Sequence, residues 1–153
     1  MIYPLLTPSL IIDGPHALPS RLTSFIPCPF TYLFKLIVID DDPTGSQTVH
    51  GSLLLLRWDP LILRRGLVHP SPILFILANT RALDGDTARD RLRVISRALK
   101  QALAWAQTCG HLDRWMVVSR GDSTLRGHFP LEAQVLDEEL GPFDAIFLAP
   151  AFL

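Results

Sequence analysis

The sequence predicts an α/β fold, an open and mostly parallel sheet of about five strands with helices on both faces. Short apolar runs alternate along the chain with helical patterns, which is the order of βαβ units. Several runs are apolar throughout, as in strands that are covered on both sides. The chain has 153 residues, 48% of them hydrophobic, which is enough for one domain with its own core.

The beginning of the chain differs in composition from the rest. Residues 1–34 contain six of the 13 prolines and only two charged residues, Asp13 and Arg21. Proline lacks the backbone donor and restricts the residue before it. We therefore expect an irregular Pro-rich extension over residues 1–34, followed by a domain over residues 35–153.

Five apolar runs of strand length follow the extension. They are residues 35–40 (KLIVID), 52–58 (SLLLLRW), 73–78 (ILFILA), 115–119 (WMVVS) and 144–149 (DAIFLA). Each is bounded by polar residues, Gly or Pro, and we predict a strand at each.

Helical patterns separate these runs. Between residues 87 and 108 apolar side chains recur with a 3.6-residue period, so we predict an amphipathic helix there. Asp84 or Asp86 can cap its beginning, and Gly110 can end it. A second helix is predicted over residues 130–140, where Pro opens the pattern and Gly follows it. Shorter helical pieces are expected after Gly45 and near residues 59–65.

The charge balance excludes several classes of partner. The formal net charge is −1, so the chain has no general attraction to nucleic acid or to anionic membranes. No uninterrupted run approaches the roughly 20 apolar residues that span a bilayer, and the first residues lack a basic signal-peptide start. The two cysteines, Cys28 and Cys109, lack zinc-site spacing. We expect a cytoplasmic protein with no nucleic-acid or membrane partner.

Three polar clusters follow predicted strands, and ligands of open α/β sheets bind beyond the carboxyl ends of strands. The first is an acidic turn in which Asp40, Asp41 and Asp42 precede Thr44 and Gly45. Adjacent carboxylates repel one another, so three in a row suggest hydroxyl recognition, cation binding or proton transfer. Helix capping is the alternative, although one Asp would suffice for it.

The second cluster is a Thr-Arg turn with Arg81, and the third is the loop over residues 119–128. Arginines bind carboxylates or phosphates with paired hydrogen bonds, and small hydroxyl side chains donate to the same anions. A surface ion-pair loop is the alternative. The predicted substrate-binding residues of the three clusters are Asp41, Asp42, Thr44, Arg81, Ser119, Arg120, Gly121, Asp122, Ser123 and Arg126.

A phosphatase of the haloacid-dehalogenase type is a competing interpretation. The stretch LIVIDDDPTG fits an hhhhDxDxT pattern in which Asp40 is the nucleophile, Asp42 the acid/base and Ser119 the phosphate-binding hydroxyl. Such enzymes also need a lysine after the serine, and no lysine follows Lys100.

Four motifs together resemble the N-terminal domain of the four-carbon acid sugar kinases. They are DDDPTGSQTVHG, NTRAL, SRGDSTLRGHFPLE and GPFDAIFLAPAF, in that order and with matching spacing, and the resemblance covers residues 36–152. It implies an ATP-dependent kinase that acts on a sugar acid such as a threonate, an erythronate or an oxo-tetronate. In that family the N-terminal domain binds the sugar acid and the C-terminal domain binds ATP.

The resemblance also implies roles for individual residues. Asp41 and Asp42 fall in the acidic turn that faces the substrate, and one of them is the expected catalytic base. ATP and Mg²⁺ are expected cofactors of the complete enzyme, with none bound by this chain, because no GxxxxGK[ST] loop is present. We expect a substrate-binding fragment that lacks its C-terminal nucleotide-binding domain and is inactive alone. A split-enzyme part and a non-catalytic remnant stay open as alternatives.

Overall fold

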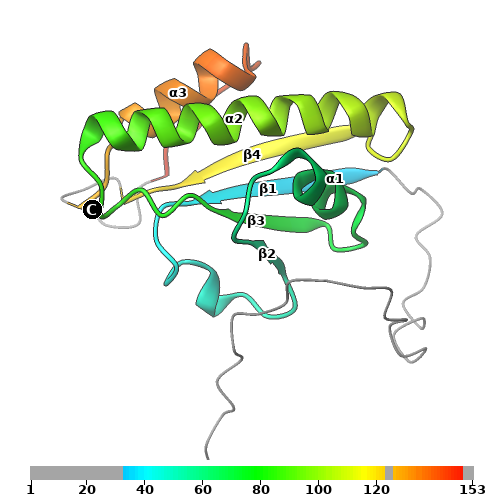
Figure 1. Cartoon of the computed structure of the whole chain (residues 1–153), viewed down its shortest axis with the longest axis horizontal. Helices are drawn as coiled ribbons and strands as arrows, with labels where there is room; N and C mark the ends of the chain where they lie inside the picture. Colours follow the sequence, from blue (N-terminus) through cyan, green and yellow to red (C-terminus); the bar gives the residue numbers. More distant parts are fainter. Residues whose placement is uncertain (1–32, 123–125, 150–153) are drawn as a thin grey trace, which may run out of the picture. The chain divides into compact units, whose positions relative to one another are not determined.

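The computed structural model describes residues 33–122 and 126–149. The Pro-rich extension expected over residues 1–34 lies almost wholly outside the described residues. Four strands form one sheet in the order β2-β3-β1-β4, and every pair is parallel (Figure 1). The strands are β1 (Phe34–Asp40), β2 (Leu53–Leu55), β3 (Ile73–Leu77) and β4 (Arg114–Arg120). The predicted open α/β sheet is thus confirmed.

Three α-helices and one 3₁₀ helix connect or follow these strands. They are η1 (Ser46–Thr48), α1 (Pro60–Val68), α2 (Gly85–Thr108) and α3 (Leu131–Leu140). The Asp84 side chain caps α2 by accepting a hydrogen bond from the Thr87 N–H at 2.9 Å. Beyond the end of α2, Gly110 has φ +68°, a left-handed conformation that favours glycine. Within the described part of the chain, no helix is both long and apolar enough to cross a membrane.

The three α-helices pack on one face of the sheet, which corrects the expectation of helices on both faces. Their buried residues form a single core with the strand side chains that point to that face, such as Ile37, Leu74 and Leu55. The connections β2–α1–β3 and β3–α2–β4 both step along the sheet toward β4. Right-handed crossovers in one direction place their helices on one face. In Figure 1 α2 and α3 lie above the sheet, and the β1–β2 connection with η1 lies below it.

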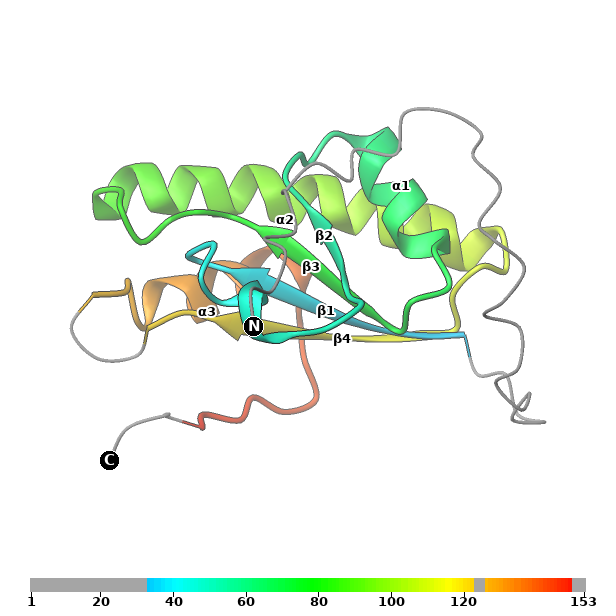
Figure 2. The ribbon, with the colours of Figure 1, turned by 90° about the horizontal axis from the view of Figure 1, so that it is seen from below.

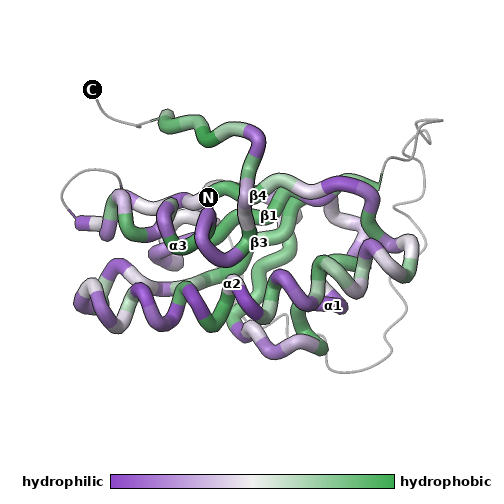
Figure 3. The backbone as a smooth tube through the Cα atoms, turned by 90° about the horizontal axis from the view of Figure 1, so that it is seen from above, coloured by the Kyte–Doolittle hydropathy of each residue, from purple (hydrophilic) through white to green (hydrophobic). Residues whose placement is uncertain are grey.

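The fifth expected strand, over residues 144–149, is not part of the sheet. These residues join no ladder, and Ile146, Phe147 and Leu148 are 64%, 91% and 63% exposed. Figures 2 and 3 show the run leaving α3 on the β4 side of the sheet, and Figure 3 colours it as hydrophobic. An apolar run forms a strand only where a neighbouring edge and a covering layer receive it. Here the ring of Phe143, just before the run, packs edge-on against the ring of Trp115 with the centroids 6.0 Å apart. The run itself continues past β4 (Figure 2).

Candidate functional site

The carboxyl ends of β1, β3 and β4 lie side by side and bring the three polar clusters to one edge. Asp40, the last residue of β1, is in register with Leu77 of β3 and Arg120 of β4. The residues that follow each strand therefore start from neighbouring positions. This edge is where open α/β sheets bind ligands.

Asp41 is the centre of the site. Its side chain is 2% exposed, and its two oxygens accept from Arg81 Nε at 3.0 Å and Arg81 Nη2 at 2.7 Å. Its Oδ2 also accepts the backbone N–H of Asp122 at 3.2 Å. The hydrogen bonding of Arg81 to the Asp41 carboxylate raises the pKa of Arg81. Asp41 thus joins the turns that follow three different strands.

Arg126 extends this network toward solvent. Its Nε donates to Asp122 Oδ2 at 2.8 Å, while 68% of the Arg126 side chain stays exposed. The sequence predicted both Asp41 and Arg126 as substrate-binding residues beyond strand ends, and Asp122 connects them in the structure. Asp41, Arg81, Asp122 and Arg126 are hereafter called the strand-end network.

Asp42 lies beside the network. Its carboxylate accepts hydrogen bonds from the Thr44 backbone N–H, at 2.9 Å, and from the Thr44 hydroxyl. Arg81 Nη1 lies 3.7 Å from Asp42 Oδ2. The Thr44 side chain, followed by its backbone N–H, lowers the pKa of Asp42, so the carboxylate stays ionised and accepts hydrogen bonds.

Asp40 is buried and has a different environment from its two neighbours. Neither carboxylate oxygen has a hydrogen-bond partner of good geometry among the described residues. Burial raises the pKa of Asp40, while the nearby Arg120 charge acts in the opposite direction. An ideal Cβ on Gly45 would lie 2.2 Å from Asp40 Oδ1, so the carboxylate packs directly against the glycine.

These facts give no support to the phosphatase alternative. A nucleophilic carboxylate has to reach its substrate, and Asp40 is 0% exposed. Ser119 is in register with Ile39, one position before the Asp40–Arg120 pair, and side chains alternate between the faces of a sheet. Asp40 and Ser119 therefore start out on opposite faces.

The remaining predicted site residues differ in their contacts with the strand-end network and its neighbours. Arg120 lies near the Asp40 carboxylate. Ser119 is exposed, and its side chain makes no hydrogen bond with the described residues. Gly121 packs against a buried acid, Glu132, which sequence reasoning missed together with Thr80. An acid in the first turn of a helix is common, so nothing in the pattern marks Glu132. Ser123 lies outside the described residues.

No group of three or more His, Cys, Asp or Glu side chains within residues 33–122 and 126–149 is arranged to hold a metal ion. The network pairs carboxylates with guanidinium groups instead. Guanidinium groups in such a network can bind a small anion, and carboxylates can accept hydrogen bonds from hydroxyl groups.

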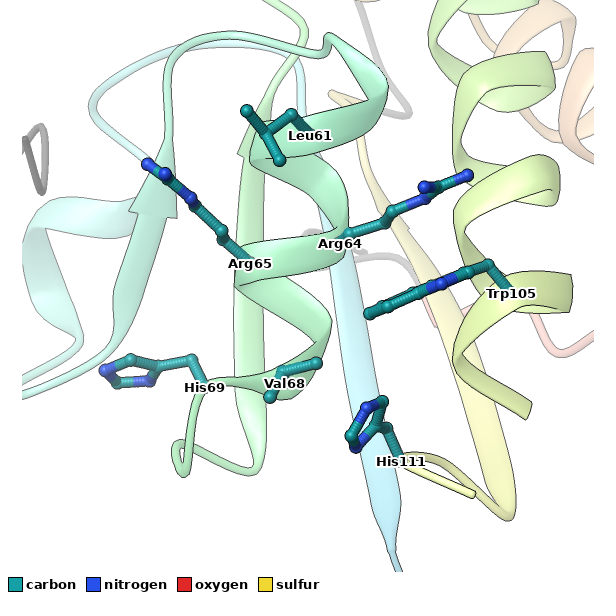
Figure 4. Close-up of a pocket in the computed structure, with 7 residues that line it drawn as sticks. All are labelled: Leu61, Arg64, Arg65, Val68, His69, Trp105 and His111. Carbon is teal, nitrogen blue, oxygen red and sulfur yellow. The ribbon is translucent and has the colours of Figure 1, made fainter. Parts of the chain in front are cut away.

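A separate hollow of about 460 Å³ lies between α1 and the end of α2 (Figure 4). The Arg64 guanidinium lies over the Trp105 ring at 5.0 Å, and His111 packs against the same ring at 5.4 Å. His69 and His111 precede β3 and β4, so this hollow opens at the amino edge of the sheet. It is at the opposite edge from the strand-end network, and we do not assign the candidate site to it. The hollow is lined by Leu61, Arg64, Arg65, Val68, His69, Trp105 and His111.

The fold and the charged residues at the carboxyl ends of its strands define a class of protein. It is an α/β domain whose charged side chains gather where parallel strands end. Residues 36–153 match the family model described as the sugar-binding N-terminal domain. The chain belongs to this family, the N-terminal domain of the four-carbon acid sugar kinases, as the four motifs predicted. No curated protein and no solved structure matches the chain.

Proposed function

We propose that this domain binds a four-carbon sugar acid at the strand-end network and presents one of its hydroxyl groups for phosphorylation by ATP. The observation that carries the proposal is the joining of Asp41, Arg81, Asp122 and Arg126 at one sheet edge. Family membership supports sugar as the ligand class. The two arginines, Arg81 and Arg126, support a ligand that carries a carboxylate group.

The arginines are proposed to bind the carboxylate of the sugar acid. Arg126 is the more accessible of the two, with 68% of its side chain exposed against 22% for Arg81. Arg81 is held by Asp41 through two hydrogen bonds, so its guanidinium plane is fixed before a ligand arrives. A fixed guanidinium loses little freedom on binding, which favours affinity.

The aspartates have distinct proposed roles. Asp41 is buried and fully engaged, and it acts by holding Arg81 in place. Asp42 is partly exposed and ionised, and it is the better acceptor for a substrate hydroxyl. Because its pKa is lowered, Asp42 is a weak base, and its main contribution is to orient the hydroxyl for attack.

Phosphoryl transfer depends on the positioning of ATP and its metal against the acceptor. In the proposed enzyme the nucleotide-binding C-terminal domain of the family supplies ATP and Mg²⁺. The residues described here bind and orient the acceptor. Ser123, Ser119, Arg120 and Thr44 are proposed to complete the walls of the site.

Titration calorimetry of the whole chain tests this proposal. The ligands are the threonate and erythronate stereoisomers and an oxo-tetronate, and the neutral alcohols threitol and erythritol serve as controls. We expect the acids to bind and the alcohols, which lack the carboxylate, to bind at least tenfold more weakly. A hydrogen bond to a charged group is worth about 1.5–3 kcal/mol, so Arg126→Ala should weaken acid binding by roughly 10- to 100-fold.

Arg97→Ala is the matched control for Arg126→Ala. Arg97 also donates to a carboxylate, Glu139, at 2.8 Å, and 65% of its side chain is exposed. It lies on α2 and outside the strand-end network. Absence of binding by every sugar acid, or equal affinity of the two variants, would reject the proposed site.

A further inference from the structure

Glu132 is a buried acid next to the strand-end network, and the proposed function gives it no role. It lies in the first turn of α3 and is 5% exposed. Its Oε1 accepts a hydrogen bond at 3.1 Å from the hydroxyl of Thr80, which is itself fully buried. An acid at the start of a helix usually points into solvent, where it favours the helix dipole. Burial of this carboxylate costs free energy and calls for another explanation.

The other oxygen of Glu132 faces the turn after β4. An ideal Cβ on Gly121 would lie 1.9 Å from Glu132 Oε2, so the carboxylate fills the space that any other residue at 121 would occupy. One carboxylate thus contacts the turn after β3, at Thr80, and the turn after β4, at Gly121. The His128 ring also contacts the turn after β3, because its Nε2 lies 3.1 Å from the Thr80 carbonyl oxygen.

The residues that follow these two contacts are members of the strand-end network. Arg81 follows Thr80, Asp122 follows Gly121, and both hydrogen-bond to the Asp41 carboxylate. The separation of the two turns therefore determines whether Arg81 and Asp122 can reach Asp41 together. Glu132 fills the space between the turns, and the charges of Asp41, His128 and Arg81 act on it.

We propose that Glu132 is a positioning residue that fixes the distance between the Thr80–Arg81 turn and the Gly121–Asp122 turn, and thereby holds Arg81 in its ligand-binding orientation. This inference rests on the proposed function for its effect on affinity. Its effect on Arg81 is independent of any ligand. Groups outside the reacting centre affect binding in this way because small displacements of charged side chains are costly.

The test compares Glu132→Ala and Glu132→Gln with the control Glu138→Ala. Glutamine keeps the length of the side chain and an oxygen that can accept from Thr80 Oγ1, whereas alanine removes both. Glu138 is also on α3 but is exposed and pairs only at the surface, with Arg93 at 3.4 Å. Thr80→Val and Gly121→Ala alter the same two contacts from the other side, so they test the inference even if Glu132→Ala does not fold.

Two readouts are measured on each variant that circular dichroism shows to be folded. The first is sugar-acid affinity by calorimetry. The second is the NMR signal of the Arg81 Nε–H, which donates to Asp41 and is assigned with Arg81→Lys. A residue that merely stabilises the fold would leave this signal unchanged in a folded variant.

We expect Glu132→Ala to weaken binding at least tenfold and to expose the Arg81 Nε–H to solvent exchange. Glu132→Gln should stay within about threefold of wild type and retain the protected signal, as should Glu138→Ala. Thr80→Val and Gly121→Ala should resemble Glu132→Ala. Unchanged affinity and an unchanged Arg81 signal in the folded variants among Glu132→Ala, Thr80→Val and Gly121→Ala would overturn the inference. If wild type binds no sugar acid, the proposed function fails, and the Arg81 signal alone decides the role of Glu132.

Discussion

Asp40, Asp41 and Asp42 are consecutive, yet each carboxylate has a different environment. The first is buried against Gly45, the second is buried in a paired network, and the third is partly exposed and bonded to Thr44. The strand–turn boundary produces this difference, because the chain changes direction after Asp40 and each side chain then faces a different neighbour. Residue type alone therefore does not assign a role to any of the three.

The buried Glu132 gives a prediction about pH at the same scale. Burial raises the pKa of Glu132 above its ordinary value of 4.5, so the folded state binds the proton more readily than the unfolded state. The contribution of Glu132 to the stability of the protein should then fall as pH rises from about 4.5 through the raised pKa of the folded state. Above the raised pKa of the folded state, the ionised carboxylate opposes folding.

Glu132→Gln removes this titration. Urea unfolding should show the variant to be more stable than wild type at pH 7, with the difference shrinking as pH falls to 4.5 and below. Glu138→Gln, at an exposed position on α3, should show no such trend. A difference that instead grows as pH falls would contradict the assignment of a raised pKa.

At the scale of elements, α2 determines much of the stability of the domain. Its buried stripe packs against both α1 and α3, and Leu99 in the middle of the stripe is 0% exposed. Leu99→Ala should lower the free energy of unfolding by about 2–5 kcal/mol, the range for buried leucines. Arg97→Ala, two residues earlier on the exposed side, should leave the urea midpoint unchanged within error. Equal midpoints for the two variants would contradict this packing.

The sequence predicted α2 well because its apolar period and both end signals are local. Strand pairing depends on partners far along the chain, and it was predicted less well. The run 52–58 is apolar, but only Leu53–Leu55 pairs with β3, because Trp58 already turns to donate its Nε1 to the Leu77 carbonyl at 3.0 Å. The run 144–149 is equally apolar and joins no strand.

In the candidate site, too, some features could be predicted from the sequence and others depend on residues far apart along the chain. The rule that ligands bind at strand ends predicted the approach of Asp41, Arg81 and Arg126, since parallel strands end at one edge. The contact between Thr80 and Glu132 joins residues 52 positions apart and depends on how α3 packs. No local pattern carries that information.

At the scale of the whole described domain, the arrangement of the strands leaves the β4 side of the sheet and part of the face without α-helices uncovered. Met116 and Val118 of β4 are exposed on the face without α-helices, and the apolar run 146–148 lies beyond that strand. Contiguous exposed apolar surface favours association. We expect the purified chain to self-associate at high concentration.

Phe147→Asp should reduce this association, measured by sedimentation velocity, without lowering the thermal midpoint, because Phe147 is 91% exposed. Val94→Asp is the control. Val94 is also exposed, at 60%, but lies singly on α2 among polar residues. Association that is unchanged in Phe147→Asp, or reduced equally in both variants, would show that the 146–148 run is not responsible.

The strand-end network joins residues that are 40 and 81 positions apart in sequence. Its parts come together only after β3 and β4 have both paired with β1, so formation of the site should be a late event in folding. A protease cut that lets the segments on either side of α2 separate would remove Asp122 and Arg126 from Asp41. If the sugar acid binds at this network as proposed, its affinity also reports whether β4 stays assembled with β1 and β3.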